Sequence, residues 1–377
     1  MRYDAAIIGA GPAGSAAARL LAQAGWHVAL MEKTQFPRRK VCGEFISATT
    51  MPVLKACGIA APFIEAAGPP VMRIGAWAGA AMLAGGREKV WGRALGREHL
   101  DTMLRDAALE AGAILLQPVE VTGLRREGEF HLCALDDGRE IMARTVIAAC
   151  GSWNPKGLFA VRPAQASPSD LFAFKAHFRD AGLAAGLMPL LAFPGGYGGL
   201  VQSDGGRVSL SCCIRRDALA AARHRHAGNA GAGKAGESVL AHIMETTKGA
   251  WLALNHAVLE GNFLSTGPIQ PGIRAGRKDG VYFAGNIAGE AHPVIAEGIS
   301  MAIQSSGLLA KMLIAGRGEA YESEWQRHFT SRIRAASLFA HLAMSDAGRF
   351  AGLAVLRAAP SLLDLGARIS GKRPAAA

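Results

Sequence analysis

Apolar residues change their spacing twice within the first segment of the chain. Tyr3 to Ile8 are mostly apolar, which predicts a short buried strand. Small residues then continue from Pro12 to a stop at Gly25, as is typical of a closely packed helix. Trp26 to Met31 form a second apolar run, so the segment predicts a strand, a helix and a parallel strand.

The next part of the chain mixes helical and alternating periods. A helical stretch is expected in segment 49–68 and a strand at 71–78. Leucine and alanine recur at helical spacing from Arg97 to Ala113, which predicts a helix with one buried face. Alternating or continuous apolar residues predict strands at 114–124, 129–135, 140–146 and 146–151. Asp137-Gly138 is typical of a hairpin turn.

From about residue 155 the pattern is dominated by β-strands. Alternating segments, separated by glycine-rich turns such as 194–199, are 171–178, 187–193 and 207–214. They predict a separate antiparallel sheet with one face covered and one face toward a pocket or a partner. A strand, a glycine-rich turn and a long apolar helix then follow in 280–316, and helices are expected from Tyr321 onward.

The turn after the first predicted strand contains the pattern GxGxxG. Gly9 permits a tight turn, Gly11 lets the backbone approach a pyrophosphate, and Gly14 lets helix and strand pack closely. Pro12 suits the first helical turn, whose free N–H groups can face phosphates. Glu32 follows the second strand and can accept hydrogen bonds from a ribose. The segment therefore predicts a dinucleotide site.

A second GxGxxG match occurs at Gly231 to Gly236. A basic stretch precedes it in place of a strand, so the context of a nucleotide loop is missing. We interpret this match as a Gly/Ala loop that opens a helix at Glu237.

The net charge of +11 raises the question of an anionic partner. The densest basic clusters, 38–40 and 215–225, lack interleaved aromatic residues, and only 6% of all residues are aromatic. Because single-stranded nucleic acid is bound on aromatic platforms, no nucleic-acid partner is expected. A solvated surface that attracts an anionic cofactor is the simpler interpretation, and peripheral contact with anionic lipid is the alternative.

Length and composition predict a globular protein of two domains or one elaborate domain, since half of its 377 residues are hydrophobic. The first glycine of the nucleotide loop stands at position 9 and leaves no room for a secretory signal. The apolar segment 351–369 is interrupted by Arg357, Pro360 and Asp364. A cytoplasmic location is expected. The six cysteines show no metal-ligand spacing, so we expect reduced thiols and no metal site.

A second helix start follows the strand and turn that contain Gly285-Asn286, in GNIAGEAHPVIAEGI. Together with the first GxGxxG, RxxLD at Arg97 and ACG at Cys150, this segment resembles an FAD-dependent family. The family contains aromatic-ring hydroxylases of the para-hydroxybenzoate type and geranylgeranyl reductases, and the resemblance spans most of the chain.

The resemblance implies a glutathione-reductase-like FAD fold of the α/β class (α+β overall). The implied parts are a discontinuous Rossmann-like FAD-binding domain (1–70, 95–155 and 275–316), an inserted antiparallel-sheet substrate domain (71–94 and 156–274) and a C-terminal helical segment (317–377).

It also implies roles for individual residues. Glu32 would bind the adenosine ribose, Arg97 the pyrophosphate side, and Gly285-Asn286 the ribityl chain. The helix that starts near Gly298 would stabilise reduced flavin through its dipole. The complete set of expected FAD contacts is Gly9, Gly11, Pro12, Ala13, Gly14, Glu32, Lys33, Cys42, Gly43, Arg97, Val121, Gly285, Asn286, Gly298 and Ile299.

The chain departs from the family at several positions. Asn286 stands where the family usually has aspartate; it can still hydrogen-bond a ribityl hydroxyl but lacks the charge. Segment 36–47 resembles the Cys-Gly-Gly stretch of the reductases, with Glu44 in place of the second glycine. Segment 194–199 resembles part of their Tyr-Gly-Trp strand. The WxWxIP pattern of halogenases is absent, which argues against halogenation.

Several side chains are candidates for chemistry. Cys42 could donate a proton beside the flavin or act as a small buried apolar residue, and His292 could be an acid or could satisfy its turn. Tyr197 could orient a substrate or pack beside a turn. Glu44 could bind substrate or the neighbouring arginines. Two further pocket candidates, equally suited to the core, are Phe174 and Phe193.

Three functions follow from the resemblance. The first is an NAD(P)H-driven monooxygenase that hydroxylates an apolar or aromatic small molecule, with NAD(P)H bound only transiently. The second is reduction of an isolated C=C bond in an isoprenoid or lipid-like substrate, with Cys42 or water as proton source. The third is a non-catalytic flavin-binding redox sensor. The sequence leaves the oligomeric state open.

Overall fold

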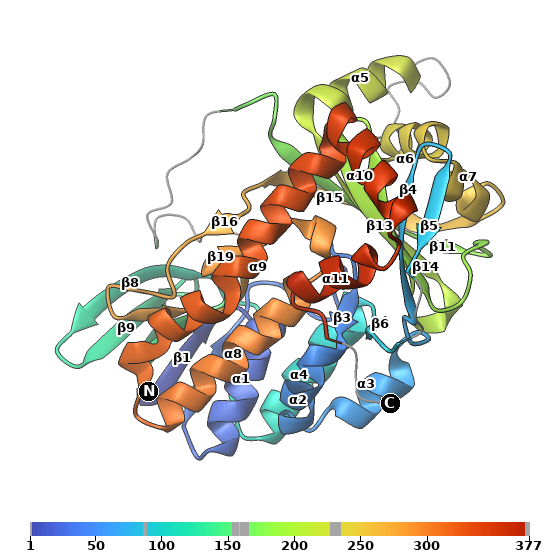
Figure 1. Ribbon diagram of the computed structural model, residues 1–377. Helices are drawn as coiled ribbons and strands as arrows, with labels where there is room; N and C mark the ends of the chain where they lie inside the picture. The colour runs from blue at the N-terminus through green and yellow to red at the C-terminus, as the bar shows by residue number, and fades with distance from the viewer. Residues whose placement is uncertain (1, 86–88, 153–157, 159–165, 227–234, 374–377) are drawn as a thin grey trace.

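The computed structural model describes residues 2–85, 89–152, 158, 166–226 and 235–373, and it contains two larger sheets with helices around them (Figure 1). The α/β fold expected from the sequence is confirmed.

The first sheet has eight strands and a largely parallel centre. Its order is β17 (Arg277–Lys278), β18 (Val281–Phe283), β10 (Glu140–Ala148), β1 (Arg2–Ile8), β2 (Val28–Met31) and β7 (Ile114–Leu116). The hairpin of β8 (Val121–Glu127) and β9 (Phe130–Leu135) extends from β10. The central strands are buried on both faces, in agreement with their continuous apolar sequence.

Three helices pack together beside this sheet. They are α1 (Pro12–Gln23), α4 (Arg97–Glu110) and α8 (Gly298–Ile314), and α1 contacts both of the others. Alanines on α1 permit this close approach because they are fully buried and small. The long apolar helix predicted near the end of 280–316 is therefore α8, a core helix.

The second sheet has seven strands. Its order is β15 (Val258–Ile269), β11 (Leu171–Arg179), β14 (Val208–Arg215), β13 (Gly196–Gln202), β12 (Leu187–Phe193), β4 (Arg73–Ala78) and β5 (Ala81–Ala84). Helices α5 (Arg216–His226), α6 (Ala235–Thr246) and α7 (Lys248–Leu254) lie beside it, and α6 and α7 help to build its core. The division of the chain into domains stays a prediction.

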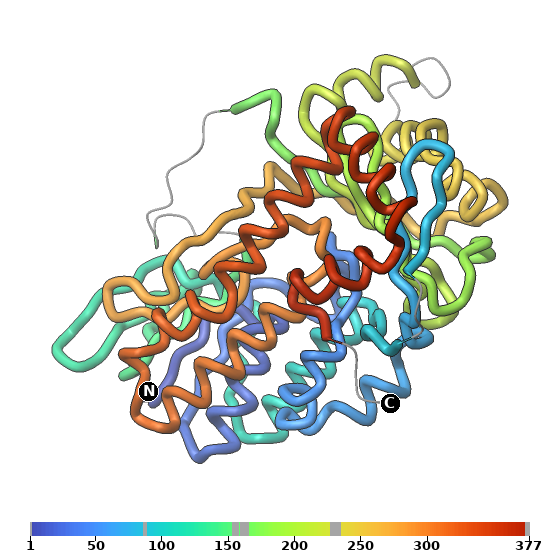
Figure 2. The backbone as a smooth tube through the Cα atoms, viewed as in Figure 1, coloured from blue at the N-terminus to red at the C-terminus, as the bar shows by residue number. Residues whose placement is uncertain are grey.

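The C-terminal helices connect the two sheets. Helix α9 (Tyr321–Met344) starts beside α8 and contacts β12 and β13 of the second sheet, so it runs the length of the molecule (Figure 1). Helices α10 (Asp346–Ala358) and α11 (Leu362–Ile369) follow. Figure 2 shows α10 beside the β4–β5 hairpin, although more than 260 residues separate them in sequence.

Small elements complete the chain. They are β3 (Phe45–Ser47) with β6 (Gly92–Ala94), β16 (Gly272–Ile273) with β19 (Gly289–Glu290), α2 (Met51–Ala56), α3 (Ala60–Ala66), and single 3₁₀ turns at Ala48–Thr50, Asp204–Gly206, Gly285–Ile287, Pro293–Ile295 and Gly318–Ala320.

Several element predictions need correction. The sheet expected to be antiparallel contains one parallel pair, β12 with β4, and the glycine-rich turn expected at 194–199 lies largely in β13, which begins at Gly196. The helix expected in 49–68 is interrupted at Gly58, which has φ +77° and ends α2. The strand expected at 114–124 is divided into β7 and β8, because Pro118 lacks an N–H for the ladder and the two strands pair with different partners. Segment 140–146 and the start of segment 146–151 form the single strand β10, which ends at Ala148. Residues 231–234 of the loop expected at 231–236 lie outside the described residues. Helix α6 begins at Ala235, two residues before the expected start at Glu237.

Candidate functional site

A cavity of about 800 Å³ lies where the start of α1, the start of α8 and the second sheet meet. Most of the expected FAD contacts line it, together with the loop 38–45 and parts of β13, β14 and β15. Gly14 is the exception: it shapes the turn from behind, because a Cβ atom there would lie 1.8 Å from the Gly9 carbonyl oxygen.

Two helix starts face this cavity. Gly11 and Pro12 at α1, and Gly298 and Ile299 at α8, line its wall. Among the described residues, no side chain caps the first turn of either helix. The unpaired N–H groups and the positive ends of both helix dipoles are therefore available to an elongated anionic ligand. A Cβ added at Gly298 would meet only open space. These features fit FAD, whose phosphates the sequence predicts at α1 and whose flavin it predicts near α8.

Glu32 is at the centre of the part of the cavity where the sequence predicts the adenosine end of FAD. Its carboxylate accepts hydrogen bonds from the N–H of Ala10 and from the N–H of Thr34, both at 2.9 Å, and pairs with Arg38 at 2.5 Å. Burial raises the pKa of this carboxyl, but Arg38 and the hydrogen bonds outweigh burial and lower it below its usual value. The group is therefore a charged acceptor, as ribose binding requires. Lys33 also lines the cavity and lies 3.7 Å from Glu120.

Arg97 is held in place on α4 by its own helix. Its guanidinium donates to both carboxylate oxygens of Asp101, one turn later, at 2.6 and 2.7 Å. Burial lowers the pKa of Arg97, but Asp101 and the adjacent Cys42 raise it above its usual value, so the cation is permanent. Cys42 lines the cavity, and its sulfur accepts the N–H of Glu44 at 3.3 Å. This arrangement places a fixed cation and a thiol side by side.

The contacts of Asn286 give a reason why this chain has asparagine where the family usually has aspartate. Its side-chain amide donates to Ser152 at 3.1 Å and to the carboxylate of Glu290 at 3.2 Å. Glu290 is 6% exposed, and burial raises its pKa despite opposing contributions from Ser152, Arg274 and Asn286. An aspartate at 286 would put two carboxylates together, so the amide suits the neighbour that this chain has.

Replacement Asn286→Asp is therefore expected to destabilise the protein by about 1 to 2 kcal/mol at neutral pH. Because the paired carboxylates would bind a proton more tightly in the folded than in the unfolded chain, stability should return on acidification. Urea unfolding across a pH series measures both effects. The double replacement Asn286→Asp/Glu290→Gln should recover most of the loss. A loss that persists in the double variant would contradict the proposed repulsion.

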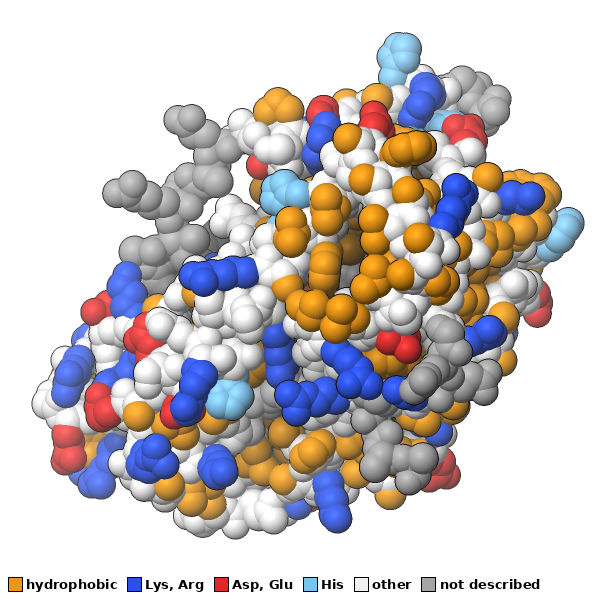
Figure 3. Space-filling view, in the orientation of Figure 1, with side chains coloured by type: hydrophobic (Ala, Val, Ile, Leu, Met, Phe, Trp, Pro, Cys, Tyr) orange, Lys and Arg blue, Asp and Glu red, His pale blue; other side chains and the backbone are white. Residues whose placement is uncertain are grey.

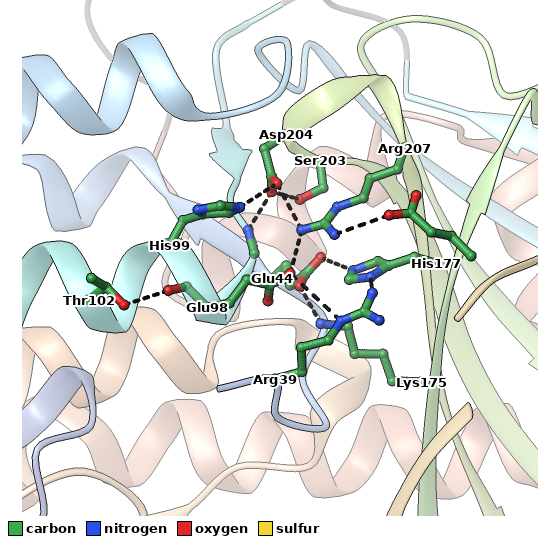
Figure 4. Close-up of polar contacts among 12 residues, drawn as sticks. Arg39, Glu44, Glu98, His99, Thr102, Lys175, His177, Ser203, Asp204 and Arg207 are labelled. Carbon is green, nitrogen blue, oxygen red and sulfur yellow. Dashed lines mark hydrogen bonds and ion pairs between the residues drawn. The ribbon is translucent and has the colours of Figure 1, made fainter. Parts of the chain in front are cut away.

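Glu44 lies at the centre of a buried polar network (Figure 4). Its carboxylate pairs with Lys175 and lies 2.8 Å from His177 Nε2, and all three side chains are at most 1% exposed. Arg39 contacts the other ring nitrogen of His177. Burial raises the pKa of Glu44, but His177 and Lys175 lower it to about 2. The partners of Glu44 are thus a lysine and a histidine in place of the expected arginines. Its expected substrate role stays a prediction, since Glu44 also lines the cavity.

The backbone at this residue is unusual. Glu44 has φ +63°, a conformation that glycine adopts freely and glutamate adopts at a cost. By the family resemblance, this is the position of the second glycine of Cys-Gly-Gly. The chain thus keeps a glycine-like backbone conformation at this position, and the ion pairs with Lys175 and His177 hold the glutamate side chain in place.

The second sheet forms the remaining wall, which is mainly apolar. Ala173, Leu200 and Leu264 line it, with Ser211 and Thr266 as hydroxyl groups. Because side chains alternate along a strand, the expected substrate contacts Phe174 and Phe193 need correction. Both point to the opposite face, where they are buried in the core with residues of α6 and α7.

Tyr197 lines the cavity and is buried. Its hydroxyl lies 3.2 Å from His292 Nδ1. His292 itself is not among the described lining residues, so it reaches the cavity only through Tyr197. Burial and the nearby His341 lower the pKa of His292 to about 4, and the ring is therefore neutral near pH 7. This geometry favours His292 as a partner of the Tyr197 hydroxyl over a role as a cationic acid.

Three residues of the site were not predicted from the sequence, namely Lys175, His177 and Arg38. A signal was present: Lys175 and His177 are polar residues two positions apart in an otherwise apolar strand, which puts them on the same face as Ala173. Their common partner, Glu44, is more than 130 residues away and could not be paired with them from local pattern.

Comparison with known proteins supports the interpretation of the cavity. Residues 2–156 match the family described as FAD binding domain. The chain is 31% identical over 166 residues to menaquinone reductase of Mycolicibacterium smegmatis, covering 41% of this chain and 39% of that protein. It is 35% identical over 165 residues to digeranylgeranylglycerophospholipid reductase 1 of Methanopyrus kandleri, covering 40% of each. The chain thus spans about two fifths of these curated relatives.

Solved structures share the fold over nearly the full length. The flavin-dependent brominase Bmp2 superposes with a TM-score of 0.78 at 20% identity, covering 98% of this chain and 94% of the brominase. PqsL of Pseudomonas aeruginosa with 2-aminobenzoylacetate gives 0.72 at 19% identity, covering 93% and 99%. Fold and site thus define a flavin-binding protein with an FAD-binding domain at its N-terminus. The chain is thus similar to a flavin-dependent brominase in its fold and to the two reductases in about two fifths of its sequence.

Proposed function

We propose that this protein is an NAD(P)H-driven monooxygenase that hydroxylates an apolar or aromatic small molecule. The observation that carries the proposal is the shape of the cavity. One wall of the cavity contains the uncapped start of α8, where the flavin is expected. The opposite wall is the mainly apolar face of the second sheet. An apolar molecule held on that face would lie beside the cofactor and away from water.

The residues of the chain have separable tasks in this reaction. Bound FAD would accept hydride from NAD(P)H and activate oxygen. Glu32 and Arg97 bind the cofactor away from the reacting end, and the dipole of α8 favours negative charge near Gly298. Burial raises the pKa of Tyr197, so its hydroxyl stays protonated. With Nδ1–H of the neutral His292 donating to this hydroxyl, the Tyr197 O–H can donate one hydrogen bond to a substrate oxygen or nitrogen. Apolar strand residues exclude water.

A second candidate is reduction of an isolated C=C bond in an isoprenoid or lipid-like substrate. Cys42 favours it, because this thiol lines the cavity beside Arg97 and could deliver a proton to a carbon atom. The relatives named as reductases of menaquinone and of digeranylgeranylglycerophospholipid support the same candidate. The third interpretation, a non-catalytic redox sensor, requires FAD that NAD(P)H does not reduce at a useful rate.

Rapid-mixing oxidation of the prereduced, FAD-loaded protein distinguishes the candidates. For hydroxylation, one NAD(P)H, one proton, one O₂ and one substrate should give one hydroxylated product, one NAD(P)⁺ and one water. The return of oxidised flavin absorbance should then require O₂. For reduction, an alkene should reoxidise the flavin without O₂, taking up one hydride and one proton.

The Cys42→Ser variant provides the matched control. It should slow anaerobic alkene reduction and leave coupled O₂ consumption little changed, because only the first reaction uses the thiol proton. Reduced flavin that neither an aromatic substrate with O₂ nor an alkene reoxidises productively would contradict both enzymatic candidates.

A further inference from the structure

The C-terminal helices expose a large apolar surface. We define the C-terminal face as the outer side of α10 and α11 together with the end of α9. Its large apolar side chains are Leu338, Leu342, Phe350, Val355, Leu365 and Ile369, which are 44% to 79% exposed. Figure 3 shows hydrophobic side chains gathered over this part of the molecule, with Lys and Arg side chains along the lower border. A contiguous patch of this kind marks an interaction site.

Helix α10 turns its apolar side to solvent, whereas a surface helix normally turns that side to the core. None of its thirteen residues, all of them described, is buried. Ala347, Phe350, Ala351, Ala354 and Val355 are all exposed, and their spacing makes one apolar stripe that points away from the protein. The sequence of α10 is therefore suited to an apolar environment outside the chain.

The surroundings of this stripe are basic. Residues 331–373 contain seven Lys or Arg and two Asp, a net charge of +5. Arg334, Arg357 and Arg368 are exposed, whereas the exposed Asp346 is paired with Arg349. An apolar stripe with basic borders is typical of helices that lie in the interface of an anionic bilayer.

The C-terminal face is rigidly attached to the cavity. Ala367 on the inner side of α11 packs with Phe45, Met188 and Val201, which line the cavity. Lys372, after α11, pairs at 3.1 Å with Glu297, the residue that precedes α8. Helix α11 therefore has its outer side in the C-terminal face and its inner side packed against residues that line the cavity.

We propose that the C-terminal face docks on the surface of an anionic phospholipid bilayer. In the described part of the chain no single helix is long and apolar enough to cross a membrane, and the pair α10–α11 reaches that composition only with a bend of 118°. The helices thus lie on the surface, with the apolar stripe among the acyl chains and the arginines at the phosphates. Docking does not depend on the reaction; delivery of a membrane-dissolved substrate to the cavity rests on the proposed function.

Vesicle flotation of the FAD-loaded, full-length protein tests this proposal. The protein should float with vesicles of phosphatidylcholine and phosphatidylglycerol, bind phosphatidylcholine alone more weakly, and lose affinity as salt is raised. Phe350→Ser/Val355→Ser should weaken binding about tenfold or more. Arg357→Gln/Arg368→Gln should remove much of the preference for the anionic vesicles.

The matched control is Val258→Ser, which changes a 58% exposed residue on β15, the edge of the second sheet opposite to β5 and α10. It should bind vesicles as the unaltered protein does. Equal binding of Phe350→Ser/Val355→Ser would show nonspecific attraction by the overall charge and would overturn the proposal. A second outcome would also overturn the proposal: the unaltered protein does not bind vesicles but self-associates in light scattering, and this variant does not self-associate. The C-terminal face would then bind a second copy of the protein. FAD content and turnover of a water-soluble substrate should be unchanged, which separates this test from that of the proposed function.

Discussion

Replacement of Glu44 by glutamine is expected to lower the free energy of unfolding by about 3 to 5 kcal/mol, because it leaves the buried Lys175 without its counterion. Urea unfolding followed by tryptophan fluorescence measures the loss. Glu140→Gln is the control, since its pair with Arg125 is exposed and should contribute less than about 1 kcal/mol. Similar small losses in both variants would contradict a buried ion pair at Glu44.

The same pair predicts how stability depends on pH. The pKa of Glu44 is about 2 in the folded protein, against a usual value of 4.5. Because the unfolded chain takes up the proton at higher pH, about 3 kcal/mol of stability is present above pH 5 and is lost as pH falls toward 2. Glu44→Gln should flatten this part of the profile. The comparison Glu44→Gly separates the two features of the site, because glycine relieves the backbone at φ +63° but still removes the carboxylate.

Replacement of Gly298 by valine is expected to weaken FAD binding by about 10- to 100-fold while leaving the fold of the apoprotein intact. A Cβ at this position meets no atom of the chain within 4 Å, so the new side chain occupies space that lines the cavity. Crowding a bound ring in this space should cost about 1 to 3 kcal/mol. Titration of the apoprotein with FAD, followed by flavin fluorescence, measures the affinity.

Two other glycines make this result interpretable. Gly366 on α11 also has open space around its position but does not line the cavity, so Gly366→Val should leave FAD affinity unchanged. Gly14→Ala should disturb the fold itself, because its Cβ would overlap the Gly9 carbonyl oxygen. If Gly298→Val bound FAD as tightly as the unaltered protein, the flavin would not lie at the start of α8.

Local pattern was sufficient for the N-terminal unit. The conformations of Gly9 and Gly25, both with positive φ, depend on glycine itself, and the strands are recognised by continuous apolar runs. The acidic residue after β2 also follows from the chain order, because parallel strands bring their carboxyl ends to one edge. Family resemblance added the start of α8, which local spacing alone would not have connected with the first helix.

Pattern did not decide which face of the second sheet borders the cavity. Alternation in β11 separates Phe174 from Ala173, but either face could be covered. Helices α6 and α7 pack on the phenylalanine side, and this packing leaves the side with the smaller residues for the site. Phe174 and Phe193 are therefore core residues, and Tyr197 is the aromatic residue that this sheet contributes to the described lining of the cavity.

The sequence by itself determined the cofactor-binding start of the chain, because a glycine turn, a helix start and a following acid act over short distances. The tertiary structure decided what surrounds that start. The partners of Glu44 come from a strand more than 130 residues later, and Asn286 is understood only beside Glu290. The apolar stripe of α10 would have been assigned to the core from its period. Only the packing of its neighbours shows that the stripe points outward, since burial depends on contacts that a helical period does not contain.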